Sequence, residues 1–200
     1  MDTPSSITAH LSARLRELRS GSGLSLDGLA ERTGVSRSMI SLIERGESSP
    51  TAAVLDKLAA GLGVTLASLF AAREGADASP LARRESQPVW RDPESGYLRR
   101  NLSAPGFPSP IELVEVILPP GARVAYDTGH RAAMVHQQIW IVEGGIELTL
   151  GDETYRLAAG DCLSMRLDRP TVFRNLAGEP ARYLVALATD GRAGPTGAKS

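Results

Sequence analysis

More than any other stretch, residues 24–50 limit what this chain can fold into, and their sequence is LSLDGLAERTGVSRSMISLIERGESSP. The pattern predicts two short helices joined by a tight turn. Ser25 is a suitable N-cap for the first helix, and Gly34 supplies the backbone freedom that a sharp turn requires. Ser36 is expected to cap the second helix, which is predicted to end at Gly46.

Small and apolar residues divide this segment into an inner and an outer face. Ala30 is small where the two helices must approach closely, and Val35, Ile40 and Ile43 are predicted to face a core. The outer face of the second helix then carries Arg37, Ser38, Ser41 and Leu42. A helix-turn-helix presents such a face to the major groove of DNA.

Three further helices are predicted around this pair. Residues 7–19 carry leucines at every third or fourth position, which is typical of a helix with one buried stripe. The next helix is predicted after the N-cap Thr51, and Gly61 and Gly63 are expected to end it. A short fifth helix is predicted over residues 65–70.

This arrangement resembles the helix-turn-helix of λ-repressor and Cro-like proteins, which are often called XRE-type regulators. Ala, Gly, Val and two Ile recur at the spacing of that family together with IERG and SPT, and the resemblance continues to Phe70. It implies a five-helix DNA-binding domain over residues 7–71. Because such proteins usually dimerise, it also implies a homodimer on a palindromic double-stranded DNA operator.

The resemblance implies DNA contacts from the second helix of the pair and from the loop after it. Arg37 and Ser41 are predicted to reach base edges, with help from Ser38. Arg45 and residues 48–51 are expected to hold phosphates. The predicted DNA-binding residues are Ser36, Arg37, Ser38, Ser41, Leu42, Arg45, Ser48 and Thr51. The alternative is a solvated helix face, which the complete turn pattern disfavours.

The charge composition excludes a strongly basic DNA-binding chain. The net charge is -1 and the pI is about 6.3. DNA affinity must then come from locally placed arginines and helix N-termini, and dimerisation would double the number of these contacts. The sequence contains no signal-peptide pattern and no apolar run of about 18 residues, so we expect a cytoplasmic protein without a membrane contact.

The pattern changes after residue 71. Residues 72–87 have little periodicity and are rich in small and charged side chains, which predicts a linker between domains. Beyond it the apolar period becomes two, in segments such as IELVEVIL, HQQIWIV and ARYLVALA, with Gly and Pro between them. Many short strands with regular turns favour an antiparallel sandwich or barrel, and the tail 191–200 is expected to be disordered.

The strand-rich part resembles a cupin, a small double-sheet barrel. The first cupin motif is matched by Trp140–Leu150 and the second by Gly160–Asn175. The predicted fold is therefore a two-domain chain, α then β: a five-helix λ-repressor-like domain followed by an antiparallel double-sheet cupin barrel over residues 88–190. The two resemblances together cover nearly all of residues 7–190.

The residues that hold a metal in cupins are replaced in this chain. Metal-binding cupins use two His and a Glu on adjacent strands, and a third His after the Pro of the second motif. Gln138 stands here at the Glu position, Ala132 and Met134 stand near the paired His, and Thr171 replaces the last His. The resemblance therefore implies no metal, no other cofactor and no enzyme activity of the ordinary cupin kind.

Two histidines remain near these positions. His130 and His136 are either displaced metal ligands or neutral hydrogen-bonding residues, and we expect the second.

A small-molecule pocket is predicted in the mouth of the barrel. A few polar groups among aromatic and thioether side chains suit such a pocket. The residues expected to face inward are Met134, His136, Gln138, Trp140, Met165, Thr171 and Phe173. The alternative is that the larger side chains of this set only pack the core.

Cys162 is the only cysteine of the chain, which excludes an internal disulfide and fits a reducing compartment. It lies two residues after Gly160 at the start of a predicted strand, where a small buried hydrophobe fits. A reactive sensor would need an exposed, electropositive setting. We therefore expect Cys162 to be buried and inert.

A helix-turn-helix followed by a cupin resembles a group of ligand-responsive bacterial transcription factors. The predicted function is sequence-specific DNA binding, with a small metabolite in the barrel favouring one relative placement of two DNA-binding domains. Two alternatives remain open: a metal-dependent cupin enzyme joined to a DNA-binding domain, and a cupin that serves only for dimerisation. No residue pattern identifies the effector, the operator or the sign of regulation.

Overall fold

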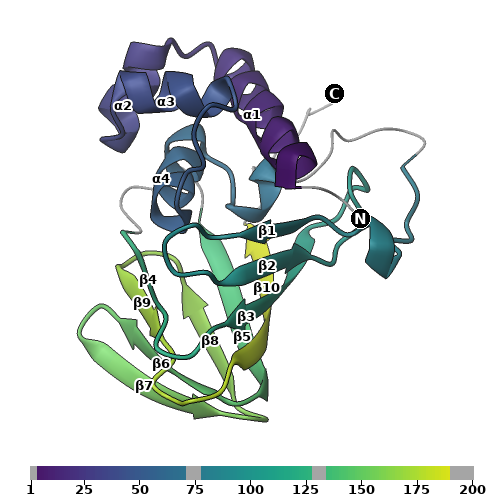
Figure 1. The fold of residues 1–200 in the computed structure, drawn as a ribbon, viewed down its shortest axis with the longest axis vertical. Coiled ribbons are helices and arrows are strands. Elements are labelled where there is room, and N and C mark those ends of the chain that lie inside the picture. The colour runs from purple at the N-terminus through teal and green to yellow at the C-terminus, as the bar shows by residue number, and fades with distance from the viewer. Residues whose placement is uncertain (1–3, 71–77, 128–133, 190–200) are drawn as a thin grey trace, which may run out of the picture.

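The computed structural model describes residues 4–70, 78–127 and 134–189, with side chains from residue 7 onward in these ranges. The described part contains a helical domain (residues 4–70) and a sheet domain (residues 89–189), which lie one above the other in Figure 1. The expected tail 191–200 and residues 72–77 of the expected linker lie outside the described residues. Residues 78–87 contain one 3-10 turn, Arg84–Ser86.

The helical domain contains α1 (Pro4–Gly21), α2 (Leu26–Thr33), α3 (Arg37–Glu44) and α4 (Ala52–Leu62). Side chains of Ser25, Ser36 and Thr51 accept a hydrogen bond from the first turn of α2, α3 and α4, which confirms the three predicted N-caps. Gly34 and Gly63 have φ of 67° and 71° at the ends of α2 and α4. Only glycine adopts this left-handed conformation without strain.

The predicted fifth α-helix is a single 3-10 turn, Ala67–Leu69. Its hydrogen bonds span three residues rather than four, as in the bond of 3.0 Å from the N–H of Phe70 to the carbonyl of Ala67. A segment of this length cannot sustain an α-helix on its own propensity, so tertiary contacts decide its path. The ring of Phe70 packs 5.7 Å from that of Trp90 in the sheet domain.

The described residues of the sheet domain form ten strands, which are β1 (Val89–Arg91), β2 (Leu98–Asn101), β3 (Ile111–Leu118), β4 (Arg123–Tyr126), β5 (Val135–Glu143), β6 (Gly145–Leu150), β7 (Glu153–Ala158), β8 (Cys162–Arg166), β9 (Thr171–Arg174) and β10 (Ala181–Thr189). They form two antiparallel sheets with the orders β1-β2-β3-β10-β5-β8 and β4-β9-β6-β7. Alternate residues of β10 are buried, as in a sheet with one face on a core.

The prediction of a closed barrel is wrong. In the described ranges no backbone ladder joins the six-stranded sheet to the four-stranded sheet, so each keeps two edge strands. The hairpin of β1 and β2 extends the larger sheet beneath the helices, as Figure 1 shows. Side chains between the two facing sheets, rather than paired strands, close the space between them.

The two domains are joined by buried polar contacts as well as by apolar packing. A carboxylate oxygen of Asp92, in the turn after β1, accepts a hydrogen bond of 2.8 Å from the N–H of Ala52 at the start of α4. Glu112 of β3 accepts hydrogen bonds from the hydroxyls of Thr65 and Ser68, the second at 3.0 Å. The helical domain therefore rests on the sheet domain through a defined set of partners.

Gly61 lies inside α4, not at its end as predicted, and we expect Gly61→Ala to destabilise the protein by about 1–3 kcal/mol. A Cβ at this position would lie 2.3 Å from Cγ2 of Thr33 in α2. Thr33 cannot turn away freely, because its hydroxyl donates to the carbonyl of Leu29 at 2.8 Å. The clash is expected to outweigh the helix propensity that alanine adds, which is about 1 kcal/mol.

Urea unfolding checks the Gly61 prediction. Thr33→Ser removes the clashing methyl group, so the loss caused by Gly61→Ala should shrink in that background. An equal loss in both backgrounds would show that the contact between α2 and α4 is not its cause.

Candidate nucleic-acid interface and ligand cavity

The exposed face of α3 is the candidate nucleic-acid interface. Ile40 and Ile43 are completely buried against the helical core, as predicted, and this fixes the rotation of the helix. Ser36, Arg37 and Ser38 consequently lie exposed at its N-terminus. Ser41 and Leu42 are half-buried on the next turn. The packing therefore gathers the predicted base-reading residues on one surface.

Arg37 is the most exposed arginine of this surface, with 64% of its side chain accessible. Its Nε lies 3.2 Å from a carboxylate oxygen of Asp27 in α2, which is exposed as well. An exposed ion pair of this kind is weak in water, so the guanidinium is free to exchange Asp27 for another acceptor. Such a group can form two parallel hydrogen bonds with a guanine.

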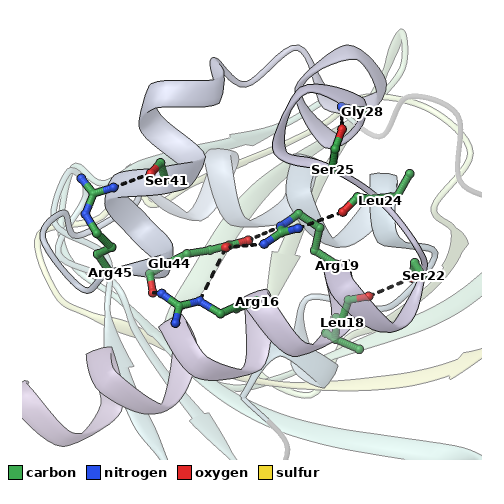
Figure 2. Close-up of polar contacts among 10 residues, drawn as sticks. All are labelled: Arg16, Leu18, Arg19, Ser22, Leu24, Ser25, Gly28, Ser41, Glu44 and Arg45. Carbon is green, nitrogen blue, oxygen red and sulfur yellow. Dashed lines mark hydrogen bonds and ion pairs between the residues drawn. The ribbon is translucent and has the colours of Figure 1, made fainter.

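The predicted phosphate-binding residues take part in a local polar network. Arg45 is exposed and forms two hydrogen bonds of 2.8 Å with Glu47, which lower the pKa of that carboxyl. Arg45 also donates to the hydroxyl of Ser41 one turn earlier in α3, a contact drawn in Figure 2. Ser48 contacts the sulfur of Met39 at 3.7 Å. Contacts of these side chains with DNA remain predictions.

A buried ion pair that was not predicted from the sequence fixes α3 on α1. Glu44 forms hydrogen bonds of 2.6 and 2.8 Å with Arg19, and its carbonyl accepts one of 2.8 Å from Arg16, as Figure 2 shows. The carboxyl of Glu44 is only 5% exposed. The available signal was its position: Glu44 follows Ile43 on the buried side of the helix, where a charge requires a partner.

The second candidate site is a cavity between the two sheets, which we call the inter-sheet cavity. Its volume is about 50 Å³. Twelve of its lining residues come from the sheet domain: Tyr97, Arg99, Val116, Val124, Tyr126, Gln137, Leu167, Thr171, Phe173, Tyr183, Val185 and Leu187. The helical domain contributes Asp56 of α4 and the following Thr65 and Leu66, so both domains enclose this space.

Hydroxyl groups and one guanidinium make up much of the polar lining. The hydroxyls of Tyr97 and Tyr126 lie 3.1 Å apart. Burial raises the pKa of both tyrosines and of Tyr183, so all three are neutral near pH 7. Arg99 of β2 is 6% exposed, and its Nε and Nη2 have no hydrogen-bond partner among the described residues.

The prediction for the inward face of β5 is wrong by one residue. Gln137, not Gln138, lines the inter-sheet cavity. The neighbouring inward positions hold the apolar residues Ile139 and Ile141, which are completely buried. The alternation of apolar residues in β5 indicates which face of the strand is buried. Assigning the inward face one residue out of step moves every side chain to the other face. The predicted pocket residues that face outward instead are Met134, His136, Gln138 and Trp140.

The other predicted pocket residues have mixed positions. Thr171 and Phe173 of β9 line the inter-sheet cavity. Met165 is buried but belongs to a separate, open hollow beside His136. The expectation that Cys162 is buried is wrong, because it is exposed on the edge strand β8, where it pairs with the outward-facing Trp140.

Comparisons with known proteins support this division of the chain. The helix-turn-helix domain family matches residues 10–70, and the cupin domain family matches residues 114–187. The chain is similar to the HTH-type transcriptional regulator SutR of Escherichia coli (strain K12), with 30% identity over 166 residues, 82% of this chain and 86% of SutR. The chain belongs to the HTH-type transcriptional regulators.

A second relative and a solved structure support the same family. PuuR, an HTH-type transcriptional regulator of the same organism, is 28% identical over 175 residues, which are 86% of this chain and 91% of PuuR. A crystal structure of a helix-turn-helix family transcriptional regulator from Vibrio cholerae superimposes with a TM-score of 0.73 and 26% identity. It covers 94% of this chain and 100% of that one. Membership of this family means that the protein is a DNA-binding regulator.

The cupin domain of this regulator does not present a metal site in its described part. The inter-sheet cavity holds one carboxyl group, a guanidinium and tyrosines whose raised pKa keeps them protonated, and these are poor ligands for a cation. No group of three or more His, Cys, Asp or Glu suited to a metal occurs among the described residues. His136 points outward, and His130 and Ala132 lie outside the described residues.

The described part of the regulator has no helix that is both long enough and apolar enough to span a membrane.

Proposed function

We propose that this regulator binds a palindromic operator as a homodimer in the bacterial cytoplasm and that a small molecule in the cupin domain controls this binding. One observation carries the proposal: the inter-sheet cavity is enclosed by both domains, because Asp56, Thr65 and Leu66 of the helical domain line it together with the strands. A ligand there touches the DNA-binding domain directly. It can therefore favour one placement of that domain over another.

The two other functions have less support. An enzyme of the ordinary cupin kind needs a metal site, and the donor groups of the inter-sheet cavity do not suit one. A cupin that only dimerises needs no cavity lined by a buried arginine, because burying an unpaired charge is unfavourable.

Operator binding tests the proposed sensing. An operator is first selected from random DNA, and its Kd is measured by fluorescence anisotropy at fixed salt with and without each compound of a metabolite panel. An effector is expected to change the Kd by roughly 5- to 150-fold. If every compound that raises the Tm of the protein leaves the operator Kd unchanged, the cupin domain does not sense for the DNA-binding domain.

Arg37→Ala tests the proposed reading of bases by α3. If Arg37 contacts a guanine, its loss should weaken binding to the selected operator by about 1–3 kcal/mol and reduce discrimination against unrelated DNA. Arg156→Ala removes the same charge from an exposed site in β7 and should leave both quantities unchanged. An unchanged ratio of specific to non-specific affinity in Arg37→Ala would refute the assignment.

A further inference from the structure

We propose that the inter-sheet cavity binds a small carboxylate, which Arg99 holds through two parallel hydrogen bonds. This inference deepens the proposed sensing function and depends on it, because it names the chemical class of the effector. It rests on the position and unmet bonding capacity of Arg99, on the remaining lining of the cavity, and on its size.

Arg99 has unmet hydrogen-bonding capacity inside the inter-sheet cavity. Arg99 is 6% exposed. It lies in β2, and its register partners are Trp90 of β1 and Val116 of β3. Its Nε and Nη2 have no hydrogen-bond partner, and it forms no ion pair with an acidic group in the described part of the chain. A guanidinium stays protonated at all ordinary pH values, so this charge cannot be relieved by losing a proton.

The two unsatisfied nitrogens identify the matching acceptor. Nε and Nη2 lie on the same edge of the guanidinium plane, where their N–H bonds are nearly parallel. A carboxylate presents two oxygens at the spacing that such a pair requires, and this bidentate contact is among the strongest hydrogen-bonded arrangements in proteins. The free edge of Arg99 is therefore a carboxylate receptor.

The rest of the lining suits a short organic acid. The hydroxyl of Thr171 is buried in the cavity and also has no hydrogen-bond partner among the described residues. The side chains of Val116, Phe173 and Val185 supply apolar surface around these polar groups. A volume of about 50 Å³ holds about four water-sized groups, which corresponds to a carboxylate with a short tail.

The position of Asp56 gives the ligand a means of acting on DNA binding. This buried acid of α4 lines the same cavity as Arg99. A carboxylate held by Arg99 lies in a space whose wall includes a side chain of α4, so its contacts differ between one placement of α4 and another. The ligand therefore biases the placement of α4, and the DNA-binding domain moves with it.

The test uses the full-length protein and three sodium carboxylates: acetate, propionate and butyrate. Tm and the calorimetric Kd are measured at constant ionic strength. Propionamide serves as the uncharged analogue and inorganic phosphate as a different oxyanion. Arg99→Met is compared with Arg100→Met, a control on the opposite face of the same strand, where the side chain pairs with Glu115 at 3.2 Å.

We expect at least one carboxylate to raise the Tm of the wild type and of Arg100→Met, whereas propionamide and phosphate raise neither. Arg99→Met should bind the same carboxylate about 10- to 100-fold more weakly. Arg99→Lys keeps the charge but lacks the two parallel donors, so it should also bind more weakly. If Arg99→Met does not fold, the carboxylate affinity of Arg99→Lys serves as the test.

Two results would overturn the inference: undiminished carboxylate binding by the Arg99 variants, or binding of phosphate or propionamide in preference to every carboxylate. Neither result affects the proposed sensing, because a compound of another class can still change the operator Kd. Sensing itself fails only if the operator Kd ignores every compound that binds. The two proposals are therefore separable.

Discussion

Replacing Glu44 with alanine should lower the free energy of unfolding by about 3–5 kcal/mol, the largest loss that we expect from any single substitution discussed here. Glu44 is the only acid within bonding distance of the side chain of Arg19 among the described residues, and both groups are largely buried. Its removal leaves a guanidinium desolvated without a counter-charge. The pair also fixes α3 against α1, so operator affinity should fall together with stability.

Urea unfolding followed by the helical circular dichroism signal measures this loss. Glu47→Ala is the matched control, because it breaks an exposed pair with Arg45 on the same loop and should change stability little. The double variant Arg19→Met/Glu44→Met removes both charges and should recover much of the loss. If Glu44→Ala is as stable as Glu47→Ala, the buried pair does not hold α3 in place.

Replacing Asn175 with alanine should lower the stability of the cupin domain by about 2–5 kcal/mol. Asn175 follows β9 and is completely buried. Its side-chain amide donates to the carbonyls of Leu118 and Glu179 at 3.0 and 2.8 Å and accepts from the N–H of Ala177 at 3.0 Å. Alanine leaves these backbone groups without that partner in a place that water reaches poorly.

Comparison with two further variants shows whether the loss of stability in Asn175→Ala comes from the lost amide hydrogen bonds. Asn175→Asp keeps the oxygen that accepts from Ala177 but loses both amide donors, so it should also be strongly destabilised. Gln138→Ala removes an exposed amide from β5 and should stay within about 0.5 kcal/mol of the wild type. Thermal unfolding of all three, monitored by near-UV circular dichroism, provides the measurement. Equal Tm values for Asn175→Ala and Gln138→Ala would contradict the predicted role.

The helical domain could be predicted from the sequence because its signals are local. The N-caps Ser25, Ser36 and Thr51 act within one turn of their own position, and the glycines that end α2 and α4 need only a left-handed backbone. The last predicted helix failed because its path depends on Phe70 reaching Trp90 in the other domain. No local pattern contains that contact.

The inter-sheet cavity could be predicted only in part, because its walls are set by strand pairing. Thr171 and Phe173 face inward as expected, whereas the polar residues of β5 were assigned to the wrong face. The segment around Arg99 is short and highly charged, and no local pattern in it predicts a buried arginine. Its burial follows from the pairing of β2 between β1 and β3, which links residues distant in sequence.

The start of α4 is completed by Asp92, which the chain reaches 40 residues later. A fragment that stops after residue 70 would lose this helix-end acceptor and the Trp90 ring that covers Phe70. Exchange of DNA-binding domains between related regulators should therefore succeed only when the receiving cupin domain supplies an equivalent carboxylate and aromatic ring. The helical domain ends at residue 70 in the sequence, but its folding depends on residues that come after this point.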